Sequence, residues 1–124
     1  MNLNQITVPV ANVEKSIAFY EILGLKLIVK DLHYARFECP NGVSTFSVHR
    51  VENLSKNAHG IWVYFEIENL DEHVKTLIEK GIVFNEMPND KSWLWRESHL
   101  EDPDGNHLIL YFAGENRLNP PWKI

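Results

Sequence analysis

The sequence has little cysteine and no long apolar run, and both absences restrict the class of protein. A single cysteine, Cys39, excludes an internal disulfide and fits a reducing compartment. No apolar stretch approaches the roughly 20 residues that a membrane helix needs. The first residues, MNLNQITVPV, lack the basic start and apolar core of a signal peptide. We therefore expect a cytoplasmic protein that does not enter a membrane.

The chain also lacks any run of basic residues. Lysine and arginine number 12 against 17 aspartate and glutamate residues, and the net charge is −5. Because nucleic-acid binding usually requires a basic patch or stripe, we expect no nucleic-acid partner. The length of 124 residues and the hydrophobic content of 44% fit one globular domain with a modest core.

A repeated segment organises this domain. Residues 10–25 and 67–82 share a strand end, a turn containing asparagine, an amphipathic helix, a glycine and the start of a new strand. Asn12 corresponds to Asn69, and Gly24 corresponds to Gly81. A unit of this size cannot bury its apolar face alone, so the two copies must pack on each other or on a partner chain.

Each copy is predicted to form one strand, one helix and three further strands. The expected class is α+β, with helices on one face of mostly antiparallel sheets. The domain then consists of a first module at about 1–55, a second at about 56–113 and a tail at 114–124, with a polar linker at 51–60. Strands are expected at 5–10, 25–30, 33–39, 43–50, 61–67, 82–86, 93–100 and 106–112, and helices at 12–24 and 70–80.

Alternation along the strands separates an aliphatic face from a mixed face of aromatic, imidazole and hydroxyl side chains. A concave small-molecule site needs such a mixture, so we predict that this face lines a ligand cleft. The alternative is a sheet face covered by solvent or by a second subunit. The predicted ligand-binding residues are Gln5, Thr7, Tyr34, Arg36, Ser47, His49, Trp62, Tyr64, Trp95, His107 and Tyr111.

Residues 92–102, SWLWRESHLED, combine two tryptophans with a carboxylate and an imidazole. Alternation places Glu97 and His99 on one face together with Trp93 and Trp95, but it does not decide which face meets the cleft. Glu97 and His99 are the candidates for an acid/base pair. The alternative is a structural ion pair of Glu97 with a basic neighbour.

The remaining reactive residues carry weaker patterns. His59 and His73 are expected to be solvent residues, and His33 only begins a strand. Cys39 is expected to serve packing, because no histidine is tied to it by spacing. In the tail, Trp122 follows Pro120 and Pro121, so this segment either folds back on its own sheet or contacts a second subunit.

The segment VPVANVEKSIAFYEILGLKLI, followed later by EDPDGNHLILY, resembles the vicinal oxygen chelate superfamily. That superfamily includes glyoxalase I, extradiol dioxygenases, and fosfomycin and bleomycin resistance proteins. The resemblance runs from Gln5 to Phe112. It implies paired βαβββ modules whose sheets curl around a cleft, usually in a homodimer. Since this fold hosts many activities, the two motifs indicate the fold and not a reaction.

The resemblance also implies where a metal would be held: at the start of the first strand and in the middle of the last strand of each module. Here those positions are Gln5, Ser47, Trp62 and Ile109. Only Gln5 offers a ligand, and a weak one, so we expect no metal or other cofactor. The alternative is a divalent metal at an irregular site made of Gln5, His49 and His107.

The function expected from these observations is binding or conversion of a small organic molecule in the sheet cleft, without the usual metal set. One alternative is a metal-dependent lyase, isomerase or dioxygenase with a displaced ligand set. Another is a non-enzymatic drug-sequestering resistance protein. The residues do not identify the ligand, and the choice between enzyme and binding protein stays open.

Overall fold

A computed structural model describes residues 1–54 and 60–124, and the chain divides into two units. Unit 1 contains Met1–Gly60 together with Asp102–Asn106. Unit 2 contains Ile61–Glu101 and His107–Ile124. Part of the predicted linker at 51–60, including His59, lies outside the described residues.

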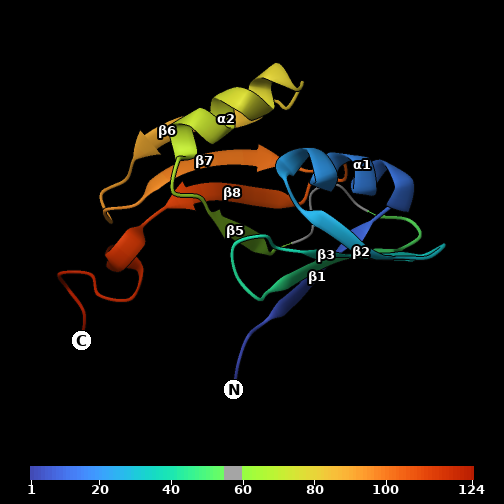
Figure 1. The fold of residues 1–124 in the computed structure, drawn as a ribbon, viewed down its shortest axis with the longest axis horizontal. Coiled ribbons are helices and arrows are strands. Elements are labelled where there is room, and N and C mark those ends of the chain that lie inside the picture. Colours follow the sequence, from blue (N-terminus) through green and yellow to red (C-terminus); the bar gives the residue numbers. More distant parts are fainter. Residues whose placement is uncertain (55–59) are drawn as a thin grey trace. The chain divides into compact units, whose positions relative to one another are not determined.

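Unit 1 is a four-stranded sheet with one helix (Figure 1). Its elements are β1 (Gln5–Val10), α1 (Val13–Leu23), β2 (Lys26–Lys30), β3 (Tyr34–Glu38) and β4 (Thr45–Arg50). The strand order is β1-β4-β3-β2, with β1 and β4 parallel and the other neighbours antiparallel. Pro9 therefore lies on an edge strand, where its missing N–H disturbs no ladder.

Local sequence signals set the ends of α1. The extended backbone of Asn12 lets its side-chain oxygen accept a hydrogen bond from the Lys15 N–H at 3.0 Å. Gly24 ends the helix with a φ of 110°, a conformation that glycine adopts without strain. The buried ring of Tyr20 packs between Phe37 and Phe46, at 5.7 and 4.6 Å between centroids. The helix thus covers the aliphatic face of the sheet.

Unit 2 repeats the same topology (Figure 1). Its elements are β5 (Trp62–Glu66), α2 (Leu70–Glu79), β6 (Phe84–Asp90), β7 (Arg96–Glu101), β8 (His107–Phe112) and the 3-10 helix η1 (Gly114–Arg117). The order β5-β8-β7-β6, with β5 and β8 parallel, matches that of unit 1. The prediction of two tandem βαβββ modules in an α+β fold is confirmed.

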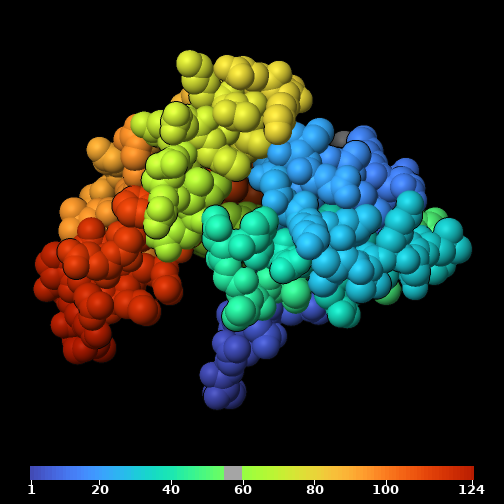
Figure 2. Space-filling view, in the orientation of Figure 1, coloured from blue at the N-terminus to red at the C-terminus, as the bar shows by residue number. Residues whose placement is uncertain are grey.

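The aliphatic face of the second sheet is buried under α2. Leu70, Val74 and Leu77 form the inward side of the helix, and Leu108 and Leu110 face them from β8. Gly81 follows the helix with a φ of 94°. The last residues, drawn in red in Figure 2, lie on the surface of this unit, and Trp122 is 56% exposed.

Two strands differ from the sequence-based expectation by more than two residues at one end, and the others by at most two. The strand expected from residue 93 begins at Arg96, because Leu94 adopts a φ of 66° in a turn closed by the Lys91 N–H bond to the Trp95 carbonyl. The strand expected at 82–86 runs instead from Phe84 to Asp90. It tolerates Pro88 because it is an edge strand with two register shifts.

The helices in the described part of the chain are too short and too polar to cross a lipid bilayer.

Candidate functional site

The strand pairing in unit 2 gathers polar and aromatic side chains on one face of its sheet. Trp62 lies opposite His107, and Tyr64 lies opposite Ile109. Since residues paired across a ladder share a face, Glu97 beside Tyr111 and His99 beside Ile109 belong to the same face. Glu97 and His99 thus share the face of His107 and Tyr111, which is the face predicted to line the cleft.

Four aromatic residues of this face, Trp62, Tyr64, Trp95 and Tyr111, are called the aromatic wall here. Trp95 and Tyr111 stack with centroids 4.8 Å apart, and Tyr64 meets both rings edge-on at 5.9 and 5.4 Å. Such stacked and edge-to-face pairs are the favoured aromatic geometries. Tyr111 is buried, whereas Tyr64 is 41% exposed and Trp62 59% exposed. The wall is therefore anchored at one end and accessible at the other.

The two tyrosines of the wall are hydrogen-bond donors at neutral pH. Burial raises the pKa of Tyr64, and the negative charge of Glu97 raises it further. Burial also raises the pKa of Tyr111, with Glu66 acting in the same direction. Both phenols therefore stay protonated.

Beside the wall lies a hydrogen-bonded series of Glu97, His99 and His107, called the carboxylate–imidazole chain. Glu97 is only 2% exposed. Its Oε1 lies 2.9 Å from Nε2 of His99, and Nδ1 of His99 lies 2.8 Å from Nε2 of His107. The indole N–H of Trp93 donates to the other oxygen of Glu97 at 2.6 Å. Glu97 and His99, predicted as an acid/base pair, are in direct contact.

A second carboxylate, Glu86 of β6, approaches the same imidazole. Its Oε2 lies 3.4 Å from Nε2 of His99. Hydrogen bonds from Lys91 and Asn89 lower the pKa of Glu86, so this carboxylate is ionised. The sequence did not single out Glu86 or Lys91. Glu86 reaches His99 because the two residues pair across the β6–β7 ladder, and Lys91 joins the cluster through its ion pair with Glu86.

His107 joins the carboxylate–imidazole chain to the accessible end of the wall. Its ring stacks on Trp62 with centroids 5.0 Å apart and planes at 21°. Partial burial lowers the pKa of His107, and the neighbouring His99 lowers it further, while Glu101 acts weakly in the opposite sense. His107 is therefore neutral at neutral pH and can accept a hydrogen bond.

The corresponding face of unit 1 is polar. The hydroxyls of Thr7 and Ser47 lie 2.6 Å apart, and Thr45 donates to the side-chain oxygen of Gln5 at 2.8 Å. The Nε–H of Arg36 donates to the Tyr34 hydroxyl at 2.9 Å.

Two titratable groups complete this unit-1 face. Partial burial raises the pKa of Tyr34, but hydrogen bonds with Ser47, Arg36 and Gln5 and the charge of Arg36 outweigh it, so the pKa is lowered. His49 lies opposite Tyr34 and is exposed. All the ligand-binding residues predicted from the sequence thus belong to these two faces; that both faces line one cleft stays a prediction.

The residues at the family's metal positions do not fit a divalent ion. Gln5 uses its side-chain oxygen for Thr45, and the Ser47 hydroxyl is paired with Thr7. Trp62 and Ile109 offer no ligand atom. In the alternative set of Gln5, His49 and His107, Nε2 of His107 is already hydrogen-bonded to His99. In residues 1–54 and 60–124, no group of three or more His, Cys, Asp or Glu side chains is arranged to hold a metal.

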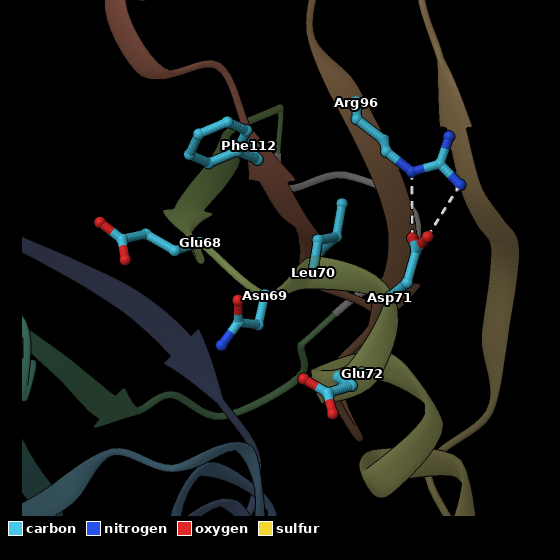
Figure 3. Close-up of a pocket in the computed structure, with 7 residues that line it drawn as sticks. All are labelled: Glu68, Asn69, Leu70, Asp71, Glu72, Arg96 and Phe112. Atoms are coloured by element: carbon cyan, nitrogen blue, oxygen red, sulfur yellow. Dashed lines mark hydrogen bonds and ion pairs between the residues drawn. The ribbon is translucent and has the colours of Figure 1, made fainter.

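A cavity of about 300 Å³ occurs elsewhere in unit 2, at the start of α2 (Figure 3). It lies on the opposite face from the aromatic wall, because Arg96 and Phe112 alternate with Glu97 and Tyr111. The Arg96 guanidinium bonds both oxygens of Asp71 at 3.0 and 3.1 Å and also reaches Asp90. The cation in this cavity is therefore already neutralised. The lining residues are Glu68, Asn69, Leu70, Asp71, Glu72, Arg96 and Phe112.

The other residues noted in the sequence lie outside these faces. Burial raises the pKa of the half-buried Cys39 thiol, so it stays protonated, as suits a packing role. His33 is exposed. His73, expected in solvent, is half-buried on α2, because it is close to the inward side formed by Leu70 and Val74.

Comparison with known proteins gives a consistent result. Residues 2–110 match the model of the Glyoxalase/Bleomycin resistance protein/Dioxygenase superfamily. The uncharacterized protein YraH of Bacillus subtilis (strain 168) is 30% identical over 127 residues, covering 90% of this chain and 98% of that protein.

Solved structures share the fold. A bleomycin resistance determinant encoded on the transposon Tn5 superposes with a TM-score of 0.80 at 19% identity, covering 92% of this chain and 99% of that one. A bleomycin-binding protein complexed with bleomycin superposes with a TM-score of 0.74 at 19% identity, covering 90% of this chain and 98% of that one. A superfamily member from Sphaerobacter thermophilus superposes with a TM-score of 0.74 at 24% identity, covering 90% of this chain and 97% of that one. The chain belongs to the glyoxalase/bleomycin resistance protein/dioxygenase superfamily.

Proposed function

We propose that this protein binds a planar organic molecule against the aromatic wall of unit 2, without a metal. The observation that carries the proposal is the exposed indole of Trp62, which is held in place by stacking on His107. A large exposed aromatic side chain that is already ordered can bind a ring with little loss of its own conformational freedom.

The composition of the site favours an uncharged or weakly acidic ring over a strong anion. Glu86 and Glu97 both lie near the imidazole of His99, and Glu101 lies near His107. In unit 2 the nearby Lys91 is paired with Glu86, Arg96 with Asp71 and Asp90, and Arg117, whose charge acts on Tyr111, with Glu66. A fixed negative charge on the ligand would therefore meet carboxylates without a spare cation beside them.

Membership of the superfamily supports this class of ligand, because a protein of the same fold is a bleomycin-binding protein in complex with bleomycin. The fold alone does not select between sequestering a ligand and converting it. A catalytic role is the second candidate, and the carboxylate–imidazole chain is the observation that favours it. We also propose a homodimer that works in the cytoplasm, on the basis of the exposed apolar side chains and the single thiol.

The binding proposal is tested with 4-nitroanisole, a planar ring without an acidic proton, in a ligand-observed NMR titration. Trp62→Ala is expected to weaken binding about five-fold or more, since one aromatic contact contributes on the order of 1 kcal/mol. Trp122→Ala is the matched control, because it removes an equally exposed indole from the tail. Equal affinity of the wild type and Trp62→Ala would refute the site.

A further inference from the structure

The hydrogen bonds of the carboxylate–imidazole chain have a fixed order of donor and acceptor. This order follows from Trp93, which bonds Glu97 at the buried end of the chain. The indole nitrogen of Trp93 can only donate, so the Glu97 oxygen at 2.6 Å accepts. A carboxylate has only acceptor oxygens, and the partner of the second Glu97 oxygen, at 2.9 Å, is Nε2 of His99. Nε2 of His99 therefore carries a proton.

The same order of donor and acceptor extends through the imidazole rings of His99 and His107. A neutral His99 with its proton on Nε2 has a lone pair on Nδ1, and this atom lies 2.8 Å from Nε2 of His107. Nε2 of His107 must then donate, which leaves Nδ1 of His107 unprotonated. Among the contacts of the described residues, no hydrogen bond involves that nitrogen. The chain thus ends in a hydrogen-bond acceptor beside Trp62.

The charges around the two rings favour a cation at the inner ring. His99 faces Glu97 of its own strand and Glu86 of β6, at 2.9 and 3.4 Å. Lys91 is paired with Glu86 and reduces this effect without removing it, because Glu97 stays close. His107 faces the ring of Trp62 and His99, with Glu101 opposite it in the ladder. Partial burial and the neighbouring His99 lower the pKa of His107.

We propose that Glu97, His99 and His107 form a proton relay that recognises a planar ring bearing an acidic O–H or N–H and takes up its proton on binding. This inference rests on the proposed binding at the aromatic wall and names the chemical class of the ligand. His107 contacts the ligand, whereas Glu97 and His99 act as positioning residues.

The proton step balances without a further reactant. The ligand O–H or N–H bond breaks, and its proton bonds to Nδ1 of His107. The proton on Nε2 of His107 moves to Nδ1 of His99. The products are the ligand anion, a neutral His107 that donates to it, and a His99 cation held between Glu97 and Glu86. The charge of the cation is thus placed next to the two carboxylates, where it is most stable.

The direction of the relay is tested without a ligand by nitrogen-15 NMR of the histidine rings. In the wild type, His107 and His99 should both be protonated on Nε2 at neutral pH. Glu97→Gln should reverse both tautomers. Trp93 can only donate, so the amide oxygen must face it and the amide NH2 must donate to Nε2 of His99. His99 then donates from Nδ1 to His107, and the outer nitrogen of His107 becomes protonated.

Glu101→Gln is the matched control. It changes the same functional group on the same strand, opposite His107, but it lies outside the hydrogen-bonded series. The tautomers should be unchanged in this variant. A wild-type His107 protonated on Nδ1, or a His107 tautomer that does not respond to Glu97→Gln, would overturn the relay.

Recognition is tested with 4-nitrophenol against 4-nitroanisole, at a pH where free nitrophenol is neutral. The wild type should bind the phenol about ten-fold or more tightly than the ether, because the phenol adds a charge-assisted hydrogen bond. The bound phenol should show the absorption band of nitrophenolate. In Glu97→Gln the band should be absent, and in Glu101→Gln it should remain.

The outcomes separate this inference from the binding proposal. If both compounds bind equally and no nitrophenolate band appears, proton uptake is refuted and the aromatic site stands. If neither compound binds, both the aromatic site and the recognition of the acidic proton are refuted. The tautomer measurement still decides the direction of the chain in that case.

Discussion

The hydroxyl of Tyr20 donates a buried hydrogen bond of 2.7 Å to Oδ2 of Asp102. Both residues belong to the motifs that carry the family resemblance, SIAFY and EDPDGN, and both belong to unit 1. Asp102 also accepts from the backbone N–H groups of Asp104 and Asn106 and from the Asn106 amide. These motifs therefore tie the 102–106 turn to α1, which explains why they mark the fold and not a reaction.

Tyr20→Phe should lower the free energy of unfolding by about 1.5–3 kcal/mol, the usual contribution of a buried hydrogen bond to a charged group. Urea denaturation at neutral pH measures the change. Tyr34→Phe is the control, because the Tyr34 hydroxyl accepts from Arg36 at a partly exposed position. That substitution should stay within about 0.5 kcal/mol. Equal effects of the two changes would contradict the importance of the Tyr20–Asp102 bond.

Alkaline pH should destabilise the fold through the same phenol. Burial and the charge of Asp102 raise the pKa of Tyr20 well above the ordinary value of about 10. Above about pH 10 the unfolded chain loses the Tyr20 proton while the folded chain keeps it, so stability is complete below that pH and falls as the pH rises. Denaturation curves on both sides of pH 10 should show a shallower decline in Tyr20→Phe. An unchanged decline would assign it to other groups, such as Tyr64 and Tyr111.

Protein purified without an affinity tag should contain far less than one transition metal per chain. Gln5, Ser47, Trp62 and Ile109 offer one weak ligand, and that ligand is already bonded to Thr45. Elemental analysis of wild type and Gln5→Ala is the measurement. A stoichiometric metal in the wild type that is lost in Gln5→Ala would show that the polar face of unit 1 rearranges to bind it.

The protein should form a homodimer at micromolar concentration. Each sheet has free edge strands, and the large exposed apolar side chains include Leu32, Val43, Val83 and Trp122. Light scattering gives the mass directly, and a monomer would contradict the prediction. Removal of residues 115–124 is the informative variant. A dimer that persists assigns the interface to the sheets, whereas its loss assigns the interface to the Trp122 segment.

Local signals made much of the fold predictable. Asn12 and Gly24 bound the first helix as expected. Alternation predicted an apolar face on the strands, and Val8, Phe37 and Phe46 on that face are buried. The errors arose where pairing overrides local pattern. The Trp93–Trp95 stretch alternates like a strand, yet it forms a turn because Lys91 bonds back to Trp95. Periodicity of one strand contains no information about its neighbour in the sheet.

The candidate site was predictable in its residue types but not in its connections. Glu97 and His99 are two apart on a strand, so the sequence already places them on one face. Their bonds to His107 and Glu86 depend on the ladders of β7 with β8 and β6, and on a register shift in β6. Such pairings are set by the whole sheet, and a single sequence does not state them.

The place of the 102–106 turn in unit 1 has a consequence for synthesis of the chain. A ribosome releases α1 and the first four strands early, but Asp102 leaves it only after β7. Until then the Tyr20 hydroxyl has no carboxylate to bond, and Asn106 is not there to donate to the Pro9 carbonyl. Unit 1 thus cannot reach its final state during its own translation. Folding of the amino-terminal half is complete only after residues 102–106 have been synthesised. A chain truncated before residue 102 should therefore be a preferred target of proteases.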